Sequence, residues 1–222
     1  MEACDASLKR LQRDVIDYYQ LHVARVSHLQ QGECIEAMET LQRQGKIRYW
    51  GHSLITFAPE PEAEFLMQAE KGHGFQLVLN LINQIALPIM ETASEKGYGI
   101  IVRMPLQFGL LSGKIKPTDV FPPDDHRSKR LTGPIIRSTL EIIQTELMPM
   151  ARQYNTTLAG LALSFILGFK EVSTVIPGIR TPEQVAKNAD HLVDLSSYDH
   201  QYLKGLFAEK WKPVLEMIKL QG

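Results

Sequence analysis

The stretch that decides the fold is residues 35–53, IEAMETLQRQGKIRYWGHS. Its first part carries an apolar residue at every third position over residues 35–41, which is typical of one face of a helix. Gly45 follows, at the position where a left-handed residue commonly ends a helix, and residues 47–53 then have the pattern of a short apolar strand. A helix joined so closely to a strand favours an α/β protein with a parallel sheet.

The alternation of helical and strand-like segments continues on both sides of this stretch. Buried parallel strands have nearly continuous hydrophobic sequences, and four further runs fit that description. They are residues 15–22 (VIDYYQLH), 75–80 (FQLVLN), 99–103 (GIIVR) and 172–178 (VSTVIPG). Helical spacing or helix caps predict helices over residues 5–11, 30–45, 59–71, 87–96, 135–154, 158–167 and 181–188.

Alternating strands and helices of this kind predict an α/β fold of the (β/α)₈ TIM-barrel type, but an incomplete one. Only about five strand–helix units can be counted, whereas a closed barrel has eight and commonly runs to about 250 residues. We expect one partial barrel domain over residues 1–222. Residues 112–133 form a long, charged, proline-containing loop, which we expect to lie over the strand ends, and residues 196–222 form a helical tail on the outside.

Composition excludes several classes of protein. The net charge of -1, without a basic arm, argues against a nucleic-acid partner. The chain has no apolar stretch of 18 residues and no signal-like N-terminus, so we expect a cytoplasmic protein without membrane spans. Cys4 and Cys34 fall on expected helices and indicate neither a disulfide framework nor a metal site.

Polar side chains at the strand ends are the first candidates for a functional site, because barrel proteins place their functional groups there. These candidates are His22, Ser53, Gln76, Asn80 and Arg103. His22 fits either a catalytic role or a structural one. Arg103 would be costly to bury alone, so it indicates either an anionic ligand or a salt bridge.

Two glycine-containing stretches add candidates for phosphate binding. Residues 108–114 (FGLLSGK) resemble a phosphate loop, although a few glycines beside a lysine also form ordinary turns. In residues 176–184, Thr181 is placed to cap a helix with Pro182 at its first position, and Arg180 stands beside the free N–H groups. This second stretch fits a nucleotide phosphate or, alternatively, a well-capped helix with no ligand.

Taken in order, these motifs resemble those of the aldo-keto reductase superfamily over nearly the whole chain. The matching segments are residues 7–11 (SLKRL), 17–22 (DYYQLH), 45–48 (GKIR), 51–53 (GHS), 105–106 (PL), 109–114 (GLLSGK), 125–127 (DHR) and 176–188. The resemblance implies a TIM barrel that transfers hydride between NADP(H) and a small-molecule carbonyl substrate, without a metal.

The resemblance also implies roles for individual residues. His22 corresponds to the catalytic histidine that orients the carbonyl, and Ser53 and Gln76 correspond to residues that bind the nicotinamide carboxamide. Arg103 stands where many members have an aromatic residue that stacks on the nicotinamide, a role that a planar guanidinium can also fill. The pyrophosphate loop would include Leu106, Gly109, Ser112 and Lys114. The adenosine end would be held by Gly178, Arg180, Gln184 and Asn188, with Arg180 favouring the 2′-phosphate of NADPH.

One part of the family pattern is not found in this sequence. The tyrosine that donates the proton, with its lysine and aspartate, lies upstream of the region matched here, and Tyr18 and Tyr19 belong to a different motif. We therefore expect a truncated reductase with little or no turnover, because general acid catalysis is typically worth about 10²–10⁴ in rate. The alternatives are a non-catalytic NADP-binding or regulatory module and a gene fragment. Unpaired barrel edges would favour self-association or a partner chain that covers them.

Overall fold

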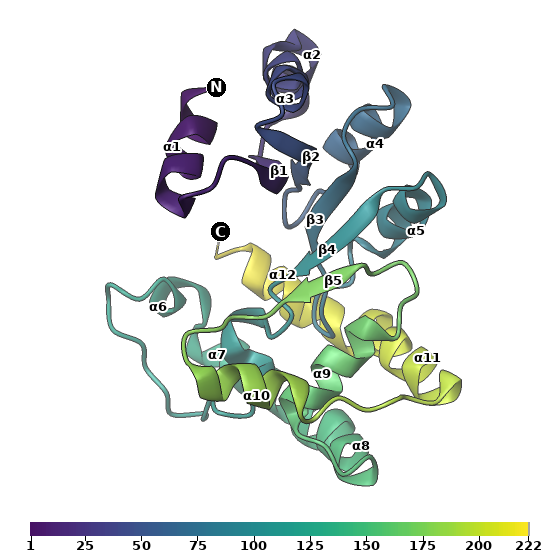
Figure 1. Ribbon diagram of the computed structural model, residues 1–222. Coiled ribbons are helices and arrows are strands. Elements are labelled where there is room, and N and C mark those ends of the chain that lie inside the picture. The colour runs from purple at the N-terminus through teal and green to yellow at the C-terminus, as the bar shows by residue number, and fades with distance from the viewer. Residues whose placement is uncertain (222) are drawn as a thin grey trace. The chain divides into compact units, whose positions relative to one another are not determined.

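A computed structural model of the protein describes residues 1–221 (Figure 1). Five strands form one sheet in the order β1-β2-β3-β4-β5, so each strand neighbours the next one along the chain. β2 pairs in parallel with both β1 and β3. The strands are β1 (Ile16–His22), β2 (Ile47–Ser53), β3 (Gly74–Val78), β4 (Gly99–Arg103) and β5 (Thr174–Ile176). The predicted α/β class and parallel pairing are confirmed.

Helices separate the strands in the sequence. Up to β4 they are α1 (Glu2–Leu11), α2 (Val26–Gln31), α3 (Glu33–Arg43), α4 (Glu60–Gln68) and α5 (Leu87–Glu95). Between β4 and β5 lie a 3₁₀ segment, η1 (Gln107–Ser112), then α6 (Arg127–Arg130), α7 (Gly133–Ile142), α8 (Met148–Gln153) and α9 (Leu158–Leu167). After β5 come α10 (Pro182–Ala189), α11 (Ser197–Leu206) and α12 (Lys212–Lys219). Within the described residues, no helix is long and apolar enough to cross a membrane.

The chain separates into two compact units, which are described one at a time. Unit 1 contains residues 1–77 and 85–101, and unit 2 contains residues 78–84 and the chain from Val102 onward. The expectation of a single domain over residues 1–222 stays a prediction.

Unit 1 is built on the amphipathic pattern that the sequence indicated. Ile35, Met38 and Leu41 of α3 are all buried, as expected for one face of that helix. Gly32 ends α2 with a left-handed backbone (φ 83°) and starts α3, so the helix expected over residues 30–45 is in fact two helices with a break at this glycine.

A tyrosine ring lies across the sheet of unit 1. Tyr18 of β1 reaches over Gly51 of β2 and Gly74 of β3, and a Cβ atom on Gly51 would clash with both the Tyr18 hydroxyl and the Gly74 carbonyl oxygen. Glycine at position 51 is therefore required by the close approach of this ring.

Unit 2 has a core centred on α9, which is apolar on nearly all sides. Leu161, Ala162, Phe165 and Ile166 are fully buried, which is typical of a helix surrounded by others. The Oγ1 atom of Thr157 caps this helix by accepting a hydrogen bond from the backbone N–H of Gly160 at 3.0 Å.

Two long helical stretches of unit 2 each contain a π-helical turn before a proline. The turns span Ile143–Leu147, between α7 and α8, and Phe207–Trp211, between α11 and α12. In each, the residue before the proline (Met148 or Lys212) donates its N–H to the carbonyl five residues back. A proline ring clashes with the carbonyl four residues before it, and the wider turn moves that carbonyl aside.

Some sequence-based boundaries were wrong. The expected strands over residues 75–80 and 172–178 are shorter, so Asn80 and Gly178 follow strands instead of ending them. The tail from residue 196 is helical, as expected, and its Leu203, Leu206 and Trp211 side chains are almost completely buried. It therefore supplies part of the core of unit 2.

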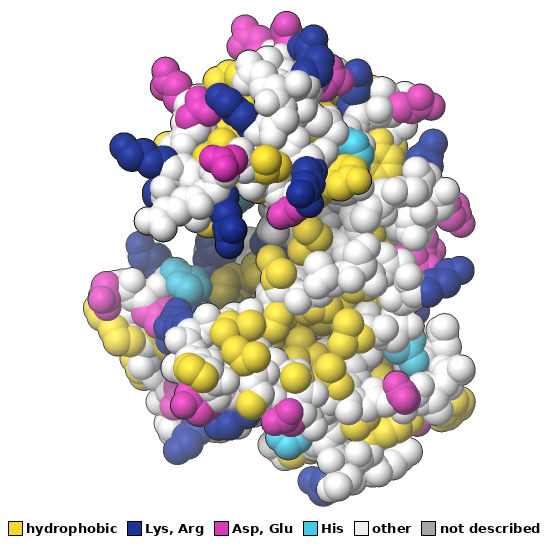
Figure 2. Space-filling model, viewed as in Figure 1, with side chains coloured by type: hydrophobic (Ala, Val, Ile, Leu, Met, Phe, Trp, Pro, Cys, Tyr) yellow, Lys and Arg dark blue, Asp and Glu magenta, His cyan; other side chains and the backbone are white. Residues whose placement is uncertain are grey.

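Apolar side chains also reach the surface of unit 2. Figure 2 shows hydrophobic side chains gathered over the region of β5 and α10. The large exposed apolar residues of this part of the chain are Ile176, Ile179, Val185 and Leu192.

Candidate functional site

Three of the predicted site residues form a row across unit 1. His22 pairs in register with Ser53, and Ser53 pairs with Gln76. Neighbouring parallel strands lie about 4.8 Å apart, and residues paired in register share one face of a sheet. The ends of β1 and β2 and the middle of β3 thus bring these three candidate side chains next to one another.

The bend after β1 is held in a strained conformation. Val23 has a left-handed backbone (φ 54°), which is unusual for a β-branched residue, and its N–H donates to the Ser53 carbonyl at 3.2 Å. The buried His52 ring lies 2.8 Å through its Nε2 from the Ala24 carbonyl oxygen. These two bonds fix the chain directly after His22. Such strain persists only where the surroundings impose it, and it is common at functional sites.

Ser53 and Gln76 are linked by a side-chain hydrogen bond. The Ser53 hydroxyl donates to Oε1 of Gln76 at 3.2 Å, and Ser53 is only 3% exposed. The Nε2 group of Gln76 has no partner among the described residues, so the pair presents an amide donor beside a hydroxyl. His22 is exposed at the end of the row.

In unit 2, Asn80 organises the loop that follows β4. Its Oδ1 accepts the backbone N–H groups of Ile82 and Asn83, both at 2.9 Å. Its Nδ2 therefore faces the other way, donating to the Met104 carbonyl at 3.0 Å and to Oε1 of Gln107 at 2.8 Å. All four hydrogen-bonding sites of this buried amide are in use, so Asn80 has a structural role in positioning the loop.

A cavity of about 520 Å³ lies beside this loop and contains several of the predicted cofactor residues. Its lining residues are Met104, Pro105, Leu106, Gln107, Phe108, Gly109, His126, Arg127, Ile176, Gly178, Arg180 and Gln184. Leu106, Gly109, Gly178, Arg180 and Gln184 were predicted as cofactor-binding residues. Volumes of this size are typical of small-molecule sites.

The η1 side of the cavity has an unusual backbone. Gln107, Phe108 and Gly109 are consecutive residues with positive φ, at 41°, 54° and 92°. The Ser112 hydroxyl donates to the Gly109 carbonyl at 2.6 Å, and the backbone N–H of Lys114 donates to the same hydroxyl at 3.3 Å. Ser112 therefore stabilises the conformation of this loop without itself lining the cavity.

The opposite side of the cavity is formed by the start of α10. The Oγ1 atom of Thr181 caps this helix by accepting from the Gln184 N–H at 3.4 Å, and Oε1 of Gln184 accepts the Arg180 N–H at 2.5 Å. These two bonds fix the backbone at Arg180. The Arg180 guanidinium has no hydrogen-bond or ion-pair partner among the described residues, and it lines the cavity.

The cavity is basic. Arg127, Arg180 and His126 line it, and its described lining includes no carboxylate side chain. Asp125 stands just outside, where hydrogen bonds from Arg127 lower the pKa of its carboxyl group to about 2. This arrangement is suited to an anionic ligand.

Besides the row in unit 1 and Asn80, four more predicted residues lie outside the described lining of this cavity: Arg103, Ser112, Lys114 and Asn188. Arg103 ends β4, its Nη1 approaches the Met104 sulfur at 3.2 Å, and partial burial lowers the pKa of its guanidinium. Lys114 is exposed. Asn188, on α10, has a buried Nδ2 with no partner among the described residues. Their cofactor roles stay predictions.

Other residues of the row and the cavity were missed as individual site residues. His52 and Arg127 belong to motifs that the sequence analysis quoted, so their segments carried a signal. Residue order alone does not tell that His52 holds the bend after β1 or that Arg127 lines the cavity.

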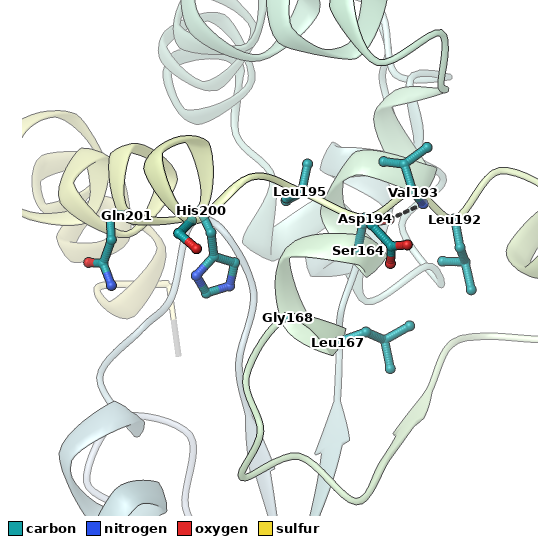
Figure 3. Close-up of a pocket in the computed structure, with 10 residues that line it drawn as sticks. Ser164, Leu167, Gly168, Leu192, Val193, Asp194, Leu195, His200 and Gln201 are labelled. Atoms are coloured by element: carbon teal, nitrogen blue, oxygen red, sulfur yellow. Dashed lines mark hydrogen bonds between the residues drawn. The ribbon is translucent and has the colours of Figure 1, made fainter.

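A second cavity, of about 460 Å³, contains none of the predicted residues (Figure 3). It lies between the end of α9 and the segment that enters α11. The Ser164 hydroxyl accepts the Val193 N–H at 2.9 Å, and Nε2 of His200 lies 2.8 Å from the Phe165 carbonyl oxygen. Both side chains thus brace the backbone around this cavity.

Comparison with known proteins identifies the family. The model of the Aldo/keto reductase family matches residues 1–208. The chain belongs to this family of oxidoreductases.

Two relatives illustrate the similarity in sequence. Aldo-keto reductase str7 of Strobilurus tenacellus is 30% identical over 198 residues, covering 84% of this chain and 56% of that protein. L-galactose dehydrogenase of Arabidopsis thaliana is 26% identical over 203 residues, covering 88% of this chain and 58% of that protein. The chain therefore spans a little over half the length of these relatives.

Solved structures agree with the fold. The holo form of aldo-keto reductase AKR11C1 from Bacillus halodurans superposes with a TM-score of 0.70 at 26% identity, covering 92% of this chain and 65% of that one. An aldo-keto reductase from Klebsiella pneumoniae in complex with NADPH gives a TM-score of 0.65 at 26% identity, covering 92% of this chain and 63% of that one. The five-stranded fold thus matches part of a TIM barrel.

Proposed function

We propose that this chain binds NADP(H) and belongs to a reductase that acts on the carbonyl group of an aldehyde or ketone. The single observation that carries the proposal is the basic cavity of unit 2, in which the free guanidinium of Arg180 stands beside the capped start of α10. A guanidinium offers two parallel N–H donors that match the oxygens of a phosphate.

The residues present fit the parts of such a cofactor. Helix N-termini bind phosphate because their N–H groups are free and their dipole end is positive. At the other end of the same helix, the unpartnered Nδ2 of Asn188 is a buried donor that a nucleotide could satisfy. In unit 1, the hydroxyl of Ser53 and the amide of Gln76 supply the donors and acceptors that a carboxamide requires.

The relatives support a nicotinamide cofactor but differ in which one they name. One solved relative is a complex with NADPH. The NADH-specific methylglyoxal reductase of Escherichia coli is 29% identical over 212 residues, covering 89% of this chain and 61% of that protein. We favour NADP(H) here because Arg180 offers a positive, planar partner to a 2′-phosphate.

In this proposal the chain's own residues orient the reactants. NADPH supplies a hydride when it is bound. His22 hydrogen-bonds the substrate carbonyl, while Ser53 and Gln76 hold the carboxamide and so fix the face of the nicotinamide ring.

We further propose that turnover by this chain is impaired. Reduction of a carbonyl leaves an alkoxide that must be protonated by a positioned acid. Tyr18 shares a sheet face with His22, but burial raises the pKa of its phenol, and its hydroxyl has no partner among the described residues. It is thus a poor proton donor. We also propose that β1–β5 correspond to strands 4 to 8 of an eight-stranded barrel, from the order of the family motifs along the chain.

Titration with NADP⁺ and NAD⁺ tests the proposal. We expect wild-type chain to bind NADP⁺ in the micromolar range, and Arg180→Met to weaken NADP⁺ roughly 10- to 100-fold, the value of one or two charge-assisted hydrogen bonds, with little change for NAD⁺. Arg137→Met is the matched control, because Arg137 is an exposed arginine on α7 that does not line the cavity. Absence of binding to both dinucleotides would refute the proposal.

A panel of aldehydes and ketones separates a weak enzyme from a non-catalytic binding module. NADPH oxidation that depends on substrate and falls in His22→Gln would establish a weak reductase. Binding of NADPH with no oxidation across the panel would favour the module.

A further inference from the structure

The second cavity of unit 2 has no part in the function proposed above (Figure 3). Its volume of about 460 Å³ is typical of small-molecule sites. Its lining comes from three places: Leu167 and Gly168 at the end of α9, the segment 192–195, and the first turns of α11. Apolar and polar side chains are combined in this lining, so the cavity suits a ligand that has both an apolar and a polar part.

One wall of the cavity is the ring of His200, which its surroundings hold in place. Its Nε2 lies 2.8 Å from the Phe165 carbonyl oxygen, which can only accept, so Nε2 carries the proton. The ring stacks on Phe165 at 5.1 Å between centroids and meets Phe169 edge-on at 4.6 Å. A Cβ atom on Gly168 would lie 2.7 Å from this ring, so the close approach of the ring requires glycine. This wall is therefore formed before a ligand binds.

The side chains of the cavity carry negative charge. Asp194 is the carboxylate of the described lining, which includes no lysine or arginine. Asp194 is exposed, and its carboxylate makes no hydrogen bond or ion pair with the described residues. In Figure 3 its side chain extends on the side of the end of α9. A carboxylate without a partner favours a cationic ligand.

The helix ends at the cavity favour a cation as well. The carbonyl groups of Leu167 and Gly168 have no hydrogen-bond partner among the described residues, and the last turn of α9 has no basic side chain. Such a helix end attracts positive charge. The start of α11 does not offset this preference, because Ser196 caps it and Asp199 in its first turn already balances its positive end.

Three leucines supply the apolar part of the lining: Leu167, Leu192 and Leu195. Leu167 is 48% exposed and Leu192 is 41% exposed, so a hydrocarbon chain packed against them would remove apolar surface from water. A metal ion would gain nothing from these side chains, and the described residues include no group of three or more His, Cys, Asp or Glu that could hold one. An organic cation with a short hydrocarbon chain fits both parts of the cavity.

We propose that this cavity binds a small aliphatic amine in its ammonium form. The ammonium group lies next to the Asp194 carboxylate and the end of α9, and the hydrocarbon chain packs against the three leucines. An ammonium group has three N–H donors, which match a carboxylate and free carbonyl oxygens. The inference is independent of NADP(H) binding, because none of the predicted cofactor residues lines this cavity.

Titration of the whole chain with hexylammonium chloride, followed by the amide chemical shifts of isotope-labelled protein, tests the proposal. We expect saturable shifts centred on Gly168 and residues 192–195, with a dissociation constant in the millimolar range. Hexanol has the same hydrocarbon chain without the charge and should bind roughly 3- to 10-fold more weakly, because it forms neither the ion pair nor the contact with the helix end. Hexanoate, which has the opposite charge, should give no saturable shifts at these residues.

Two matched variants test the role of the carboxylate. Asp194→Asn should weaken hexylammonium about 3- to 5-fold, the value of an exposed ion pair, and should leave hexanol unchanged. Asp190→Asn removes the same charge from an exposed position at the end of α10 that does not line the cavity, and it should leave both ligands unchanged. Because both substitutions are conservative and exposed, we expect both variants to melt at the temperature of the wild-type chain.

Three results would overturn the inference. Equal affinity for hexylammonium and hexanol would mean that the cavity recognises only a hydrocarbon chain. Equal weakening by the two variants would mean that the net charge of the chain attracts the amine, without a contact at Asp194. Shifts that are absent, or that do not saturate at Gly168 and residues 192–195, would mean that the cavity binds no amine. Each of these results would leave the proposed binding of NADP(H) intact.

Discussion

Replacing Asn80 with aspartate should strongly destabilise unit 2, and more so at high pH. The change keeps the shape of the side chain and the two bonds that Oδ1 accepts. It removes both donated bonds, so the part-buried Met104 carbonyl and the buried Oε1 of Gln107 lose this donor. Leaving a buried hydrogen-bonding group without its partner costs about 1–3 kcal/mol, so the loss of both donated bonds should cost about 2–6 kcal/mol in total. That is a large part of a typical domain stability of about 5–15 kcal/mol.

The pH dependence follows from the burial of the new carboxyl group. Asn80 is fully buried, so burial would raise the pKa of an aspartate there above the unfolded value of about 3.9. The folded state would then hold a proton that the unfolded state has released, and stability falls as pH rises between the two pKa values. The loss relative to wild type should therefore be smaller at pH 5, where the protonated group can still donate one bond, than at pH 8.

Urea unfolding of wild-type and variant chains at both pH values measures this effect. Asn155→Asp is the matched control, because it makes the same chemical change at an exposed position and should stay within about 0.5 kcal/mol of wild type. A loss below about 1 kcal/mol at pH 8, or one that does not change with pH, would refute the assigned role of Asn80.

Three further substitutions test the close approach of the Tyr18 ring in unit 1 and the cap of α9 in unit 2. Gly51→Ala should destabilise unit 1 by about 3 kcal/mol or more, because the added Cβ would clash with the Tyr18 ring and the rigid Gly74 carbonyl. The control is Gly205→Ala, at an open helical position, which should stabilise the protein by about 0.5–1 kcal/mol. Equal melting temperatures for these two variants would contradict the close approach of the ring. Thr157→Ala should lower the free energy of unfolding by about 1 kcal/mol, because it removes the cap on α9. Urea unfolding measures this loss, and an unchanged midpoint would show that the cap is unimportant.

The row of His22, Ser53 and Gln76 could be predicted because strand ends are visible in the sequence. Each apolar run stops at or near a polar residue, and parallel strands with short joints bring such residues to one edge. In the structure, the register of β1, β2 and β3 makes the three residues neighbours. The role of His52 could not be predicted, because alternation places it on the other face without showing that it reaches the Ala24 carbonyl.

The cavity of unit 2 was predictable in part. The glycine-containing stretches and the capped start of a helix indicated Gly109, Gly178 and Arg180 as candidates for phosphate binding from local sequence alone. Arg127 was missed because its surroundings are tertiary: the Phe121 ring and the cavity wall come together only in the folded chain. Likewise, Asn80 appeared to be a strand-end ligand, yet hydrogen bonds from two separate segments occupy all its polar atoms.

The π-helical turns of unit 2 have a consequence for how such helices are recognised. Buried residues recur at every fourth position from α7 into α8, namely Ile135, Thr139, Ile143, Leu147 and Ala151. A straight α-helix has 3.6 residues per turn, so a stripe with this spacing would rotate by about 40° at each step and leave the core. The widened turn cancels much of that rotation. A mainly apolar repeat of four that includes the residue two before a proline is thus a sequence pattern that indicates a π-turn, and a search for ordinary amphipathic periodicity would discard it.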